Sequence, residues 1–298
     1  MFTGCGTALV TPFRRNQSLD EQTLRQLVRR QIDAGVNFLV PCGTTGESPT
    51  LTRAEQLRVM VITLEESGGR VPVLAGAGGY NTAEVIELAR EFKAIGANGI
   101  LSVTPYYNRP TQEGLFQHYA AIAAAVELPI VLYNVPGRTG CNIDPATVVR
   151  LAAIENIVGI KEASGNISQM AAVLAKAPRD FIVLSGDDSV TVPLMAIGGR
   201  GVISVVSNEI PAEMTRLVQF CAEGNFGRAR ELHKQYFPLM EVNFVESNPM
   251  PVKAAMGMMG LLEPVLRLPL VAPKAETLAK IRGVLESLGM LKQAYAAI

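Results

Sequence analysis

The sequence predicts a (β/α)₈ barrel, or TIM barrel, in which eight parallel strands alternate with helices, followed by a C-terminal helical extension. Short apolar runs alternate strictly with amphipathic segments eight times, and parallel strands need such helical crossovers. No Pro-, Gly- or Ser-rich linker divides the chain before about residue 223, and the strand pattern stops after that point. The alternative arrangement of the same elements is a doubly wound open sheet.

Each expected strand is a short apolar run bounded by turn residues. The eight runs are 7–10, 38–41, 73–75, 99–103, 130–133, 157–161, 182–185 and 201–205. Each expected helix carries apolar residues at helical spacing, with polar residues between them. These helices are 20–34, 53–67, 82–95, 113–126, 145–151, 168–177, 190–196 and 212–223.

The last quarter of the chain reads as helical. We therefore expect residues 1–224 to form the catalytic barrel and residues 225–298 to form an extension packed on it. The extension is expected to contain three helices, at 226–243, 249–261 and 274–288. Such an appendix either caps the barrel or forms a subunit interface, and both readings stay open.

The composition excludes several classes of function. Lys and Arg total 27 and so do Asp and Glu, so no basic surface is expected to hold nucleic acid or a membrane. No apolar run is long enough to span a bilayer, and the N-terminal residues do not resemble a signal peptide. The four cysteines lack zinc spacing, and two histidines are too few for a multi-histidine metal site or a Ser-His-Asp triad. We expect a cytoplasmic protein without a metal that acts on small molecules.

The stretch from Ile157 to Gly165 carries the clearest chemical signal. It is an apolar strand that ends on Lys161. Side chains alternate along a strand, so Gly159 shares a face with Lys161 and leaves room there. Loss of hydration lowers the pKa of a lysine, and its neutral amine can form a Schiff base with a carbonyl. The alternative is a lysine that reaches solvent or pairs with a carboxylate.

Other strand ends carry groups that suit an anionic keto substrate, because the catalytic side chains of a parallel barrel come from these ends. Thr44 and Thr45 lie in a Gly-Thr-Thr-Gly-Glu turn that suits a small carboxylate or, alternatively, caps the next helix. Tyr133 ends the strand that precedes the strand of Lys161, so a phenol and an amine are expected at the same mouth of the barrel. Arg138 follows in the next loop, where its guanidinium either binds a carboxylate in two places or lies in solvent.

Four further positions are less specific. Tyr106 and Tyr107 form an aromatic pair after the fourth strand, for which interface packing is the alternative to a role in the site. Asp187 is read as a helix N-cap, and the alternative is that it faces the pocket. Ile203 is placed near the mouth, where chiefly its backbone would be useful.

Four motifs together closely resemble the dihydrodipicolinate synthase family, in order and along essentially the whole chain. They are Gly43–Glu47, Tyr106–Asn108, Tyr133–Gly140 and Gly159–Glu162. The resemblance implies a homotetrameric (β/α)₈ enzyme, a dimer of dimers, that condenses pyruvate with L-aspartate-4-semialdehyde on the route to diaminopimelate and lysine. It implies no cofactor beyond a covalent imine between Lys161 and pyruvate.

The resemblance also implies residue roles. Tyr133 resembles the proton donor and acceptor, linked through Thr44 to Tyr107, which in the family comes from a neighbouring subunit. Thr45 and Ile203 resemble the residues that hold the pyruvate carboxylate. Arg138 resembles the residue that binds the carboxylate of the semialdehyde.

The site for feedback inhibition by lysine departs from the family pattern. Ser48, Glu84 and Tyr106 fit that pattern. Arg53, Gln56 and Tyr80 stand where a common bacterial pattern has two histidines and an asparagine. The added positive charge of Arg53 would repel a cationic effector, so we expect weak inhibition by lysine or none.

Three other functions compete. The first is another pyruvate-dependent aldolase or dehydratase of the same superfamily, such as an N-acetylneuraminate lyase or a 2-keto-3-deoxy-sugar-acid aldolase. The second is a nicotinamide-dependent oxidoreductase, against which the glycine-rich turn Gly76–Gly79 fails the dinucleotide fingerprint at Asn81. The third is a barrel that binds ligands without catalysis, which requires an inert Lys161.

Overall fold

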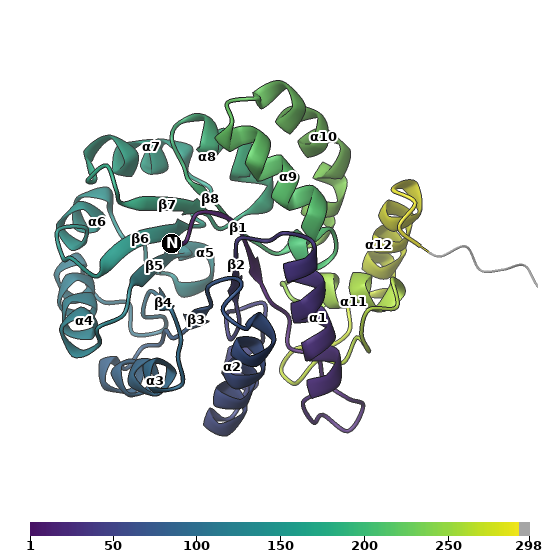
Figure 1. The fold of residues 1–298 in the computed structure, drawn as a ribbon, viewed down its shortest axis with the longest axis horizontal. Helices are drawn as coiled ribbons and strands as arrows, with labels where there is room; N and C mark the ends of the chain where they lie inside the picture. The colour runs from purple at the N-terminus through teal and green to yellow at the C-terminus, as the bar shows by residue number, and fades with distance from the viewer. Residues whose placement is uncertain (292–298) are drawn as a thin grey trace, which may run out of the picture.

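The computed structural model describes residues 1–291, and its eight parallel strands form a barrel inside a ring of helices (Figure 1). The strands are β1 (Gly4–Ala8), β2 (Phe38–Val40), β3 (Leu74–Gly76), β4 (Gly99–Val103), β5 (Ile130–Asn134), β6 (Ile157–Glu162), β7 (Ile182–Ser185) and β8 (Gly201–Ser204). The order β2-β1-β8-β7-β6-β5-β4-β3 closes through a parallel bridge between Leu39 and Val73. The predicted TIM barrel is confirmed, and the open-sheet alternative is wrong.

Helices follow the strands as crossovers. They are α1 (Glu21–Asp33), α2 (Arg53–Ser67), α3 (Thr82–Ala94), α4 (Gln112–Ala125), α5 (Pro136–Thr139), α6 (Pro145–Leu151), α7 (Ile167–Lys176), α8 (Thr191–Ala196) and α9 (Pro211–Ala222), with 3₁₀ turns η1 (Ser48–Thr50), η2 (Asp188–Val190) and η3 (Val206–Asn208). Polar caps explain where several of them begin, because a side-chain oxygen accepts an otherwise unpaired backbone N–H. Asp20, Thr52, Asn81, Thr111 and Asn166 act in this way.

The first strand begins earlier in the chain than the sequence pattern predicts. Residues 7–10 are the expected run, whereas β1 spans Gly4–Ala8. Gly6 looks like a turn residue in the sequence, but a Cβ at this position would lie 2.2 Å from the ring of Phe38. The glycine is therefore required by packing inside the barrel. The short helix α5 was not predicted, because its four residues are too few to show a periodic pattern.

Apolar side chains fill the barrel on both faces of the sheet. The interior cluster includes Phe2, Phe38, Leu101, Leu184 and Ile203. A larger cluster lies between the strands and the surrounding helices. Burial on both faces explains why the strands read as continuous apolar runs.

The C-terminal extension contains α10 (Phe226–Val242), α11 (Met250–Met258) and α12 (Ala275–Ser287), and it lies beside α9 and α1 in Figure 1. One cluster joins these helices to the barrel wall around Val202, and another joins Val252 and Met256 to Val10 and Leu27. The division of the chain at residues 224 and 225 stays a prediction. The last residues of the predicted extension, 292–298, lie outside the described residues.

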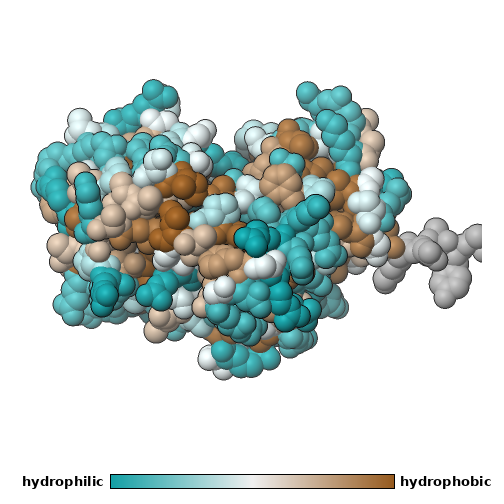
Figure 2. Space-filling view, turned by 90° about the horizontal axis from the view of Figure 1, so that it is seen from above, coloured by the Kyte–Doolittle hydropathy of each residue, from teal (hydrophilic) through white to brown (hydrophobic). Residues whose placement is uncertain are grey.

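The surface carries scattered hydrophobic side chains among hydrophilic ones, as Figure 2 shows for one face. The larger exposed ones include Tyr80, Tyr107, Phe244, Val245, Leu268 and Val271. Within residues 1–291, no helix has the length and hydrophobicity needed to cross a membrane.

Candidate active site

Lys161 and Tyr133 meet at the mouth of the barrel. They are directly paired in the register of β6 and β5, so their side chains leave the sheet on the same side. The Nζ atom of Lys161 lies 4.3 Å from the centroid of the Tyr133 ring. Lys161 is 5% exposed, which excludes the alternative in which it reaches solvent. None of the ion pairs within residues 1–291 involves it.

The carboxylate next to Lys161 in the chain is turned away from it. Glu162 is buried and accepts hydrogen bonds from Asn134, from the backbone N–H of Ser164 and from Gln169. Successive side chains of a strand point to opposite faces, so this network lies behind the barrel wall. The amine of Lys161 therefore faces the cavity without a carboxylate partner in the described part of the chain.

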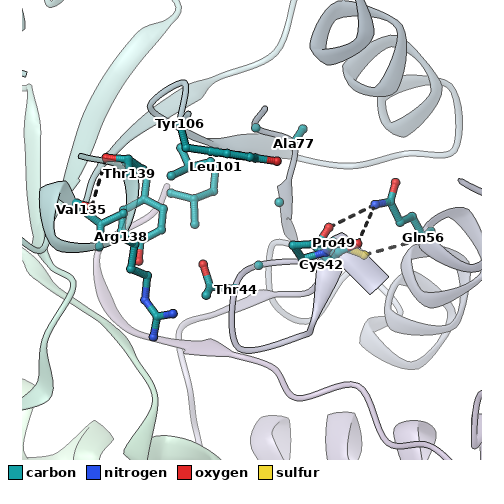
Figure 3. A pocket seen from close by; sticks show the side chains of 16 residues that line it. Cys42, Thr44, Pro49, Gln56, Ala77, Leu101, Tyr106, Val135, Arg138 and Thr139 are labelled. Atoms are coloured by element: carbon teal, nitrogen blue, oxygen red, sulfur yellow. Dashed lines mark hydrogen bonds between the residues drawn. The ribbon is translucent and has the colours of Figure 1, made fainter. Parts of the chain in front are cut away.

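Two adjoining cavities open above Lys161 and Tyr133. The smaller, of about 180 Å³, is lined by Lys161, Thr45, Asp187 and Asn248, among others. The larger, of about 320 Å³, extends past Tyr106 towards Ser48 and Gln56. Both share the residues Gly43, Thr44, Leu101, Tyr133, Val135 and Arg138. Figure 3 shows Thr44, Arg138 and Tyr106 around the larger opening.

The Gly43–Glu47 turn brings Thr44 and Thr45 to this cavity, as predicted. Thr45 is buried, and its Oγ1 accepts a hydrogen bond of 2.9 Å from Nδ2 of Asn248. The turn is held from below by Thr11, whose hydroxyl donates to the carbonyl of Gly46 at 2.7 Å. The hydroxyl groups of Thr44 and Thr45 and the nearby backbone offer donors to a small anion.

Arg138 is the only arginine that lines either cavity among the described residues. It lies in α5, where Pro136 begins the helix and Gly140, with a φ of +66°, ends it. The hydroxyl of Thr139 donates to the carbonyl of Cys141 and fixes this loop. Nη2 of Arg138 donates to the backbone carbonyl of Asn248 at 3.1 Å. The side chain is exposed, so it remains open to an incoming anion.

Three predicted positions differ in their relation to the cavity. Tyr107 is 93% exposed and lines neither cavity, so its role in a relay stays a prediction. Ile203 is fully buried in the barrel interior with Tyr133, and it does not line either cavity. Asp187 caps η2 by accepting from the backbone N–H of Ser189, as expected, and it also lines the smaller cavity.

Two residues of the site escaped the sequence analysis. Gly186 leaves space for the lysine, because a Cβ there would lie 3.0 Å from Cε of Lys161. Its position directly after the β7 strand was the available signal. Asn248 contacts both Thr45 and Arg138, yet it lies 203 residues from Thr45 in the chain. No local pattern marks such a residue.

The cavity contains no cluster suited to a metal. Within residues 1–291, no three His, Cys, Asp or Glu side chains come close enough to hold one. His118 lies instead against α3, where its Nδ1 is 2.8 Å from the hydroxyl of Thr82. Burial lowers the pKa of His118 to about 4.

Comparison with known proteins identifies the family. The model of the dihydrodipicolinate synthetase family matches residues 1–288. The chain belongs to this family. A 4-hydroxy-tetrahydrodipicolinate synthase of Koribacter versatilis is 52% identical over 99% of this chain and 98% of its own. The predicted family, the predicted activity and the predicted enzyme class, a carbon–carbon lyase, are thereby confirmed.

Solved structures of the dihydrodipicolinate synthetase family have the same fold. The dihydrodipicolinate synthase from Aquifex aeolicus is 42% identical, with a TM-score of 0.96 over 98% of this chain and all of that one. The chloride-inhibited dihydrodipicolinate synthase from Acinetobacter baumannii, solved with pyruvate, is 41% identical, with a TM-score of 0.96 over the same shares. The whole described barrel thus matches enzymes of this family.

Three of the residues at the expected effector position, Ser48, Gln56 and Tyr106, line the larger cavity. Gln56 donates from Nε2 to the hydroxyl of Ser48 at 3.1 Å. The ring of Tyr80 packs edge-on against Tyr106, with 5.2 Å between centroids. Arg53 is paired with Glu91 at 2.8 Å, so part of its charge is neutralised by the neighbouring helix α3.

Proposed function

We propose that this chain condenses pyruvate with L-aspartate-4-semialdehyde through an imine on Lys161, the reaction of a 4-hydroxy-tetrahydrodipicolinate synthase. One observation carries the residue assignment, namely a buried lysine amine beside the Tyr133 ring at the base of a cavity. The pyruvate bound to the Acinetobacter baumannii relative supports a keto acid as the first substrate.

In the proposed reaction, Nζ of Lys161 attacks the keto carbon of pyruvate and water leaves, which gives the imine. Transfer of a methyl proton to Tyr133 gives an enamine. Its carbon attacks the aldehyde of the second substrate, whose oxygen takes a proton from Tyr133. The amine of that substrate then attacks the imine carbon, closes the ring and releases Lys161. The reaction requires no cofactor.

The other residues of the site bind and relay. Thr45, with the backbone near Ile203, holds the carboxylate of pyruvate, and Arg138 holds the carboxylate of the semialdehyde. Thr44 connects Tyr133 to Tyr107. The placement of Thr44, Thr45 and Arg138 around the same cavity as Lys161 supports these roles.

Borohydride trapping tests the imine. Incubation with pyruvate and borohydride should attach a reduced pyruvyl group to the peptide that contains Lys161, as read by mass spectrometry. The variant Lys161→Arg is the matched control, because it keeps a long basic side chain but cannot form this imine. Absence of a mass gain on the wild-type peptide would contradict the mechanism.

Substrate choice is tested separately, with the semialdehyde assayed against sugar acids. Condensation with L-aspartate-4-semialdehyde should proceed, while cleavage of N-acetylneuraminate and of 2-keto-3-deoxy-sugar acids should be at background. The variant Arg138→Ala should lose condensation and retain the trapped imine. Cleavage of a sugar acid in preference to condensation would assign the chain to the rival activity.

We further propose a homotetramer, a dimer of dimers, in which Tyr107 completes the neighbour's site. The exposed Tyr107 side chain, on a residue with a φ of +69°, supports this arrangement. Mixing the inactive variants Lys161→Ala and Tyr107→Ala tests it, because a Tyr107 donated across an interface restores one working site. Recovery of activity, together with a tetramer in sedimentation, is the expected result. No recovery would place Tyr107 in its own subunit's site or outside the relay.

We also propose a cytoplasmic location, supported by four cysteines that are all buried and free. Fractionation of cells that produce the tagged protein tests this. The activity should be found in the cytoplasmic fraction, and its presence in a membrane or extracellular fraction would contradict the proposal.

A further inference from the structure

Asn248 connects the two side chains proposed to bind the substrates' carboxylates. Its Nδ2 donates to Thr45 Oγ1 at 2.9 Å, and its backbone carbonyl accepts from Arg138 Nη2 at 3.1 Å. The residue is 4% exposed and lines the cavity that contains Lys161. It belongs to the C-terminal extension, just before α11, and not to the barrel.

The direction of the first hydrogen bond matters for Thr45. A hydroxyl group has one hydrogen to donate and two lone pairs to accept with. Because the amide N–H of Asn248 occupies a lone pair, the hydrogen of the Thr45 hydroxyl remains available. A carboxylate in the cavity is the acceptor that suits it, since hydrogen bonds to charged acceptors are the stronger ones.

The second hydrogen bond restricts Arg138. An exposed arginine samples many rotamers, and ordering it on binding lowers affinity. One N–H of the guanidinium is already held by the carbonyl of Asn248, while the side chain stays open to solvent. The guanidinium group of Arg138 is thereby kept near the cavity before a substrate binds. This contact uses the backbone of Asn248, so it does not depend on the side chain.

A buried ion pair fixes Asn248 against the Gly43–Glu47 turn. Lys253, five residues further along the chain, lies 2.5 Å from the carboxylate of Glu47, and both side chains are fully buried. Lys253 also donates to the carbonyl of Thr11 at 2.9 Å. The second oxygen of Glu47 accepts from the backbone N–H of Arg267 at 3.1 Å. The extension therefore contacts the Gly43–Glu47 turn at two residues, Glu47 and Thr45.

We propose that Asn248 is a positioning residue of the reaction, which directs the Thr45 hydroxyl at pyruvate with its side chain and restrains Arg138 with its backbone carbonyl. The inference rests on the proposed function. Because the imine forms before the semialdehyde enters, kcat/KM for each substrate reports a separate half-reaction. The side chain of Asn248 should therefore matter for pyruvate alone.

The variants Asn248→Ala and Asn248→Asp test this split. Asn248→Ala removes the donor to Thr45, and kcat/KM for pyruvate should fall about tenfold, as for one lost hydrogen bond to a charged group. The value for the semialdehyde should stay within about twofold, because the backbone carbonyl remains. Asn248→Asp preserves the volume but accepts the hydroxyl hydrogen and repels an anion, so its loss for pyruvate should be larger.

A matched control and a double variant separate positioning from general disruption. Asn243→Ala removes another buried asparagine of the extension, one that donates to Glu209. Calculated for the folded fraction of this variant, both kcat/KM values should equal those of the wild type. In a Thr45→Val background, Asn248→Ala should add less than about twofold for pyruvate, because it acts through the missing hydroxyl.

Each outcome decides the matter. An equal loss for both substrates, no loss for pyruvate, or full additivity with Thr45→Val would overturn the positioning role. Circular dichroism and thermal unfolding of each variant report folding independently. Failure of wild-type protein to trap pyruvate would instead overturn the proposed function, so the two failures are distinguishable.

Discussion

Lys161 and Lys253 are both buried, but their surroundings give them different chemistry. Lys161 faces a cavity beside a phenol ring, whereas Lys253 is enclosed with Glu47. Burial lowers the pKa of Lys253, and the carboxylate of Glu47 opposes this shift. The sequence predicted the position of Lys161 because its strand and its glycine are local. The environment of Lys253 depends on a partner 206 residues away, which a local pattern does not show.

A second residue-scale consequence concerns His118, whose pKa burial lowers from 6.5 to about 4. Between these pH values the unfolded chain binds a proton at this position and the folded protein does not. The contribution to stability is therefore present above pH 6.5 and is lost as the pH falls towards 4. Urea unfolding of wild type and His118→Gln across this range should show a flatter pH dependence in the variant. Parallel curves would contradict the assignment. Burial also lowers the pKa of His233, so His233→Gln is a comparison that should flatten the curve as well.

At the scale of elements, strand and helix positions followed from the sequence, and their exceptions have physical causes. The helix α2 begins and ends where the pattern placed it, because Thr52 and Glu55 form a capping box at its start. β1 was misplaced because Gly6 serves packing against Phe38 rather than a turn. The α5 helix that carries Arg138 was missed because it is a single turn. Thus patterns located the strand ends, but not the shape of the loops that follow them.

The end of β7 provides a test at this scale. A Cβ on Gly186 would lie 2.6 Å from the Cβ of Ala163 and 3.0 Å from Cε of Lys161. Gly186→Ala should therefore displace the lysine and slow the formation of the trapped imine by about tenfold, a cost typical of overpacking. Gly283→Ala is the control, because its added Cβ meets nothing within 4 Å. An unchanged trapping rate in Gly186→Ala would show that the site accommodates the extra carbon.

The helices α2 and α3 bear on the response to lysine. Arg53 adds a cation on α2, three residues before Gln56, which lines the larger cavity, although Glu91 offsets part of the charge. Titration of the condensation reaction with millimolar lysine should show weak inhibition or none. Arg53→His, which restores the residue type of the common bacterial pattern, should raise the sensitivity. Strong inhibition of the wild type would overturn this expectation.

At the scale of the whole molecule, the extension and the barrel form one structure around the site. Arg267 donates to the carbonyls of Gln17 and Thr50 and pairs with Glu55, which lowers the pKa of that carboxyl to about 2. The sequence left open whether the extension caps the barrel or forms a subunit interface. These contacts show that it packs on the barrel, against the turn that carries Thr44 and Thr45.

The buried pair of Glu47 and Lys253 tests the importance of this junction. Lys253→Met leaves the carboxylate of Glu47 buried without its partner, so the free energy of unfolding should fall by about 3–5 kcal/mol. Denaturant unfolding measures this. The double variant Glu47→Gln with Lys253→Met removes both charges and should recover most of the loss. Lys93→Met, at an exposed pair with Glu127, should change the stability by less than about 1 kcal/mol. If Lys253→Met also lowered the free energy of unfolding by less than about 1 kcal/mol, the junction would not be tightly coupled.

The pairing of β1 with β8 has a consequence for how the protein is made. Gly4 lies opposite Gly201, so the first strand leaves the ribosome long before its second neighbour exists. Throughout most of translation, the nascent chain thus exposes one unpaired edge of β1, and unpaired strand edges promote aggregation. Phe2 is fully buried in the folded barrel, but in that period the later strands that cover it have not been made. Chaperone dependence in the cell should therefore be greatest for nascent chains that stop short of residue 201.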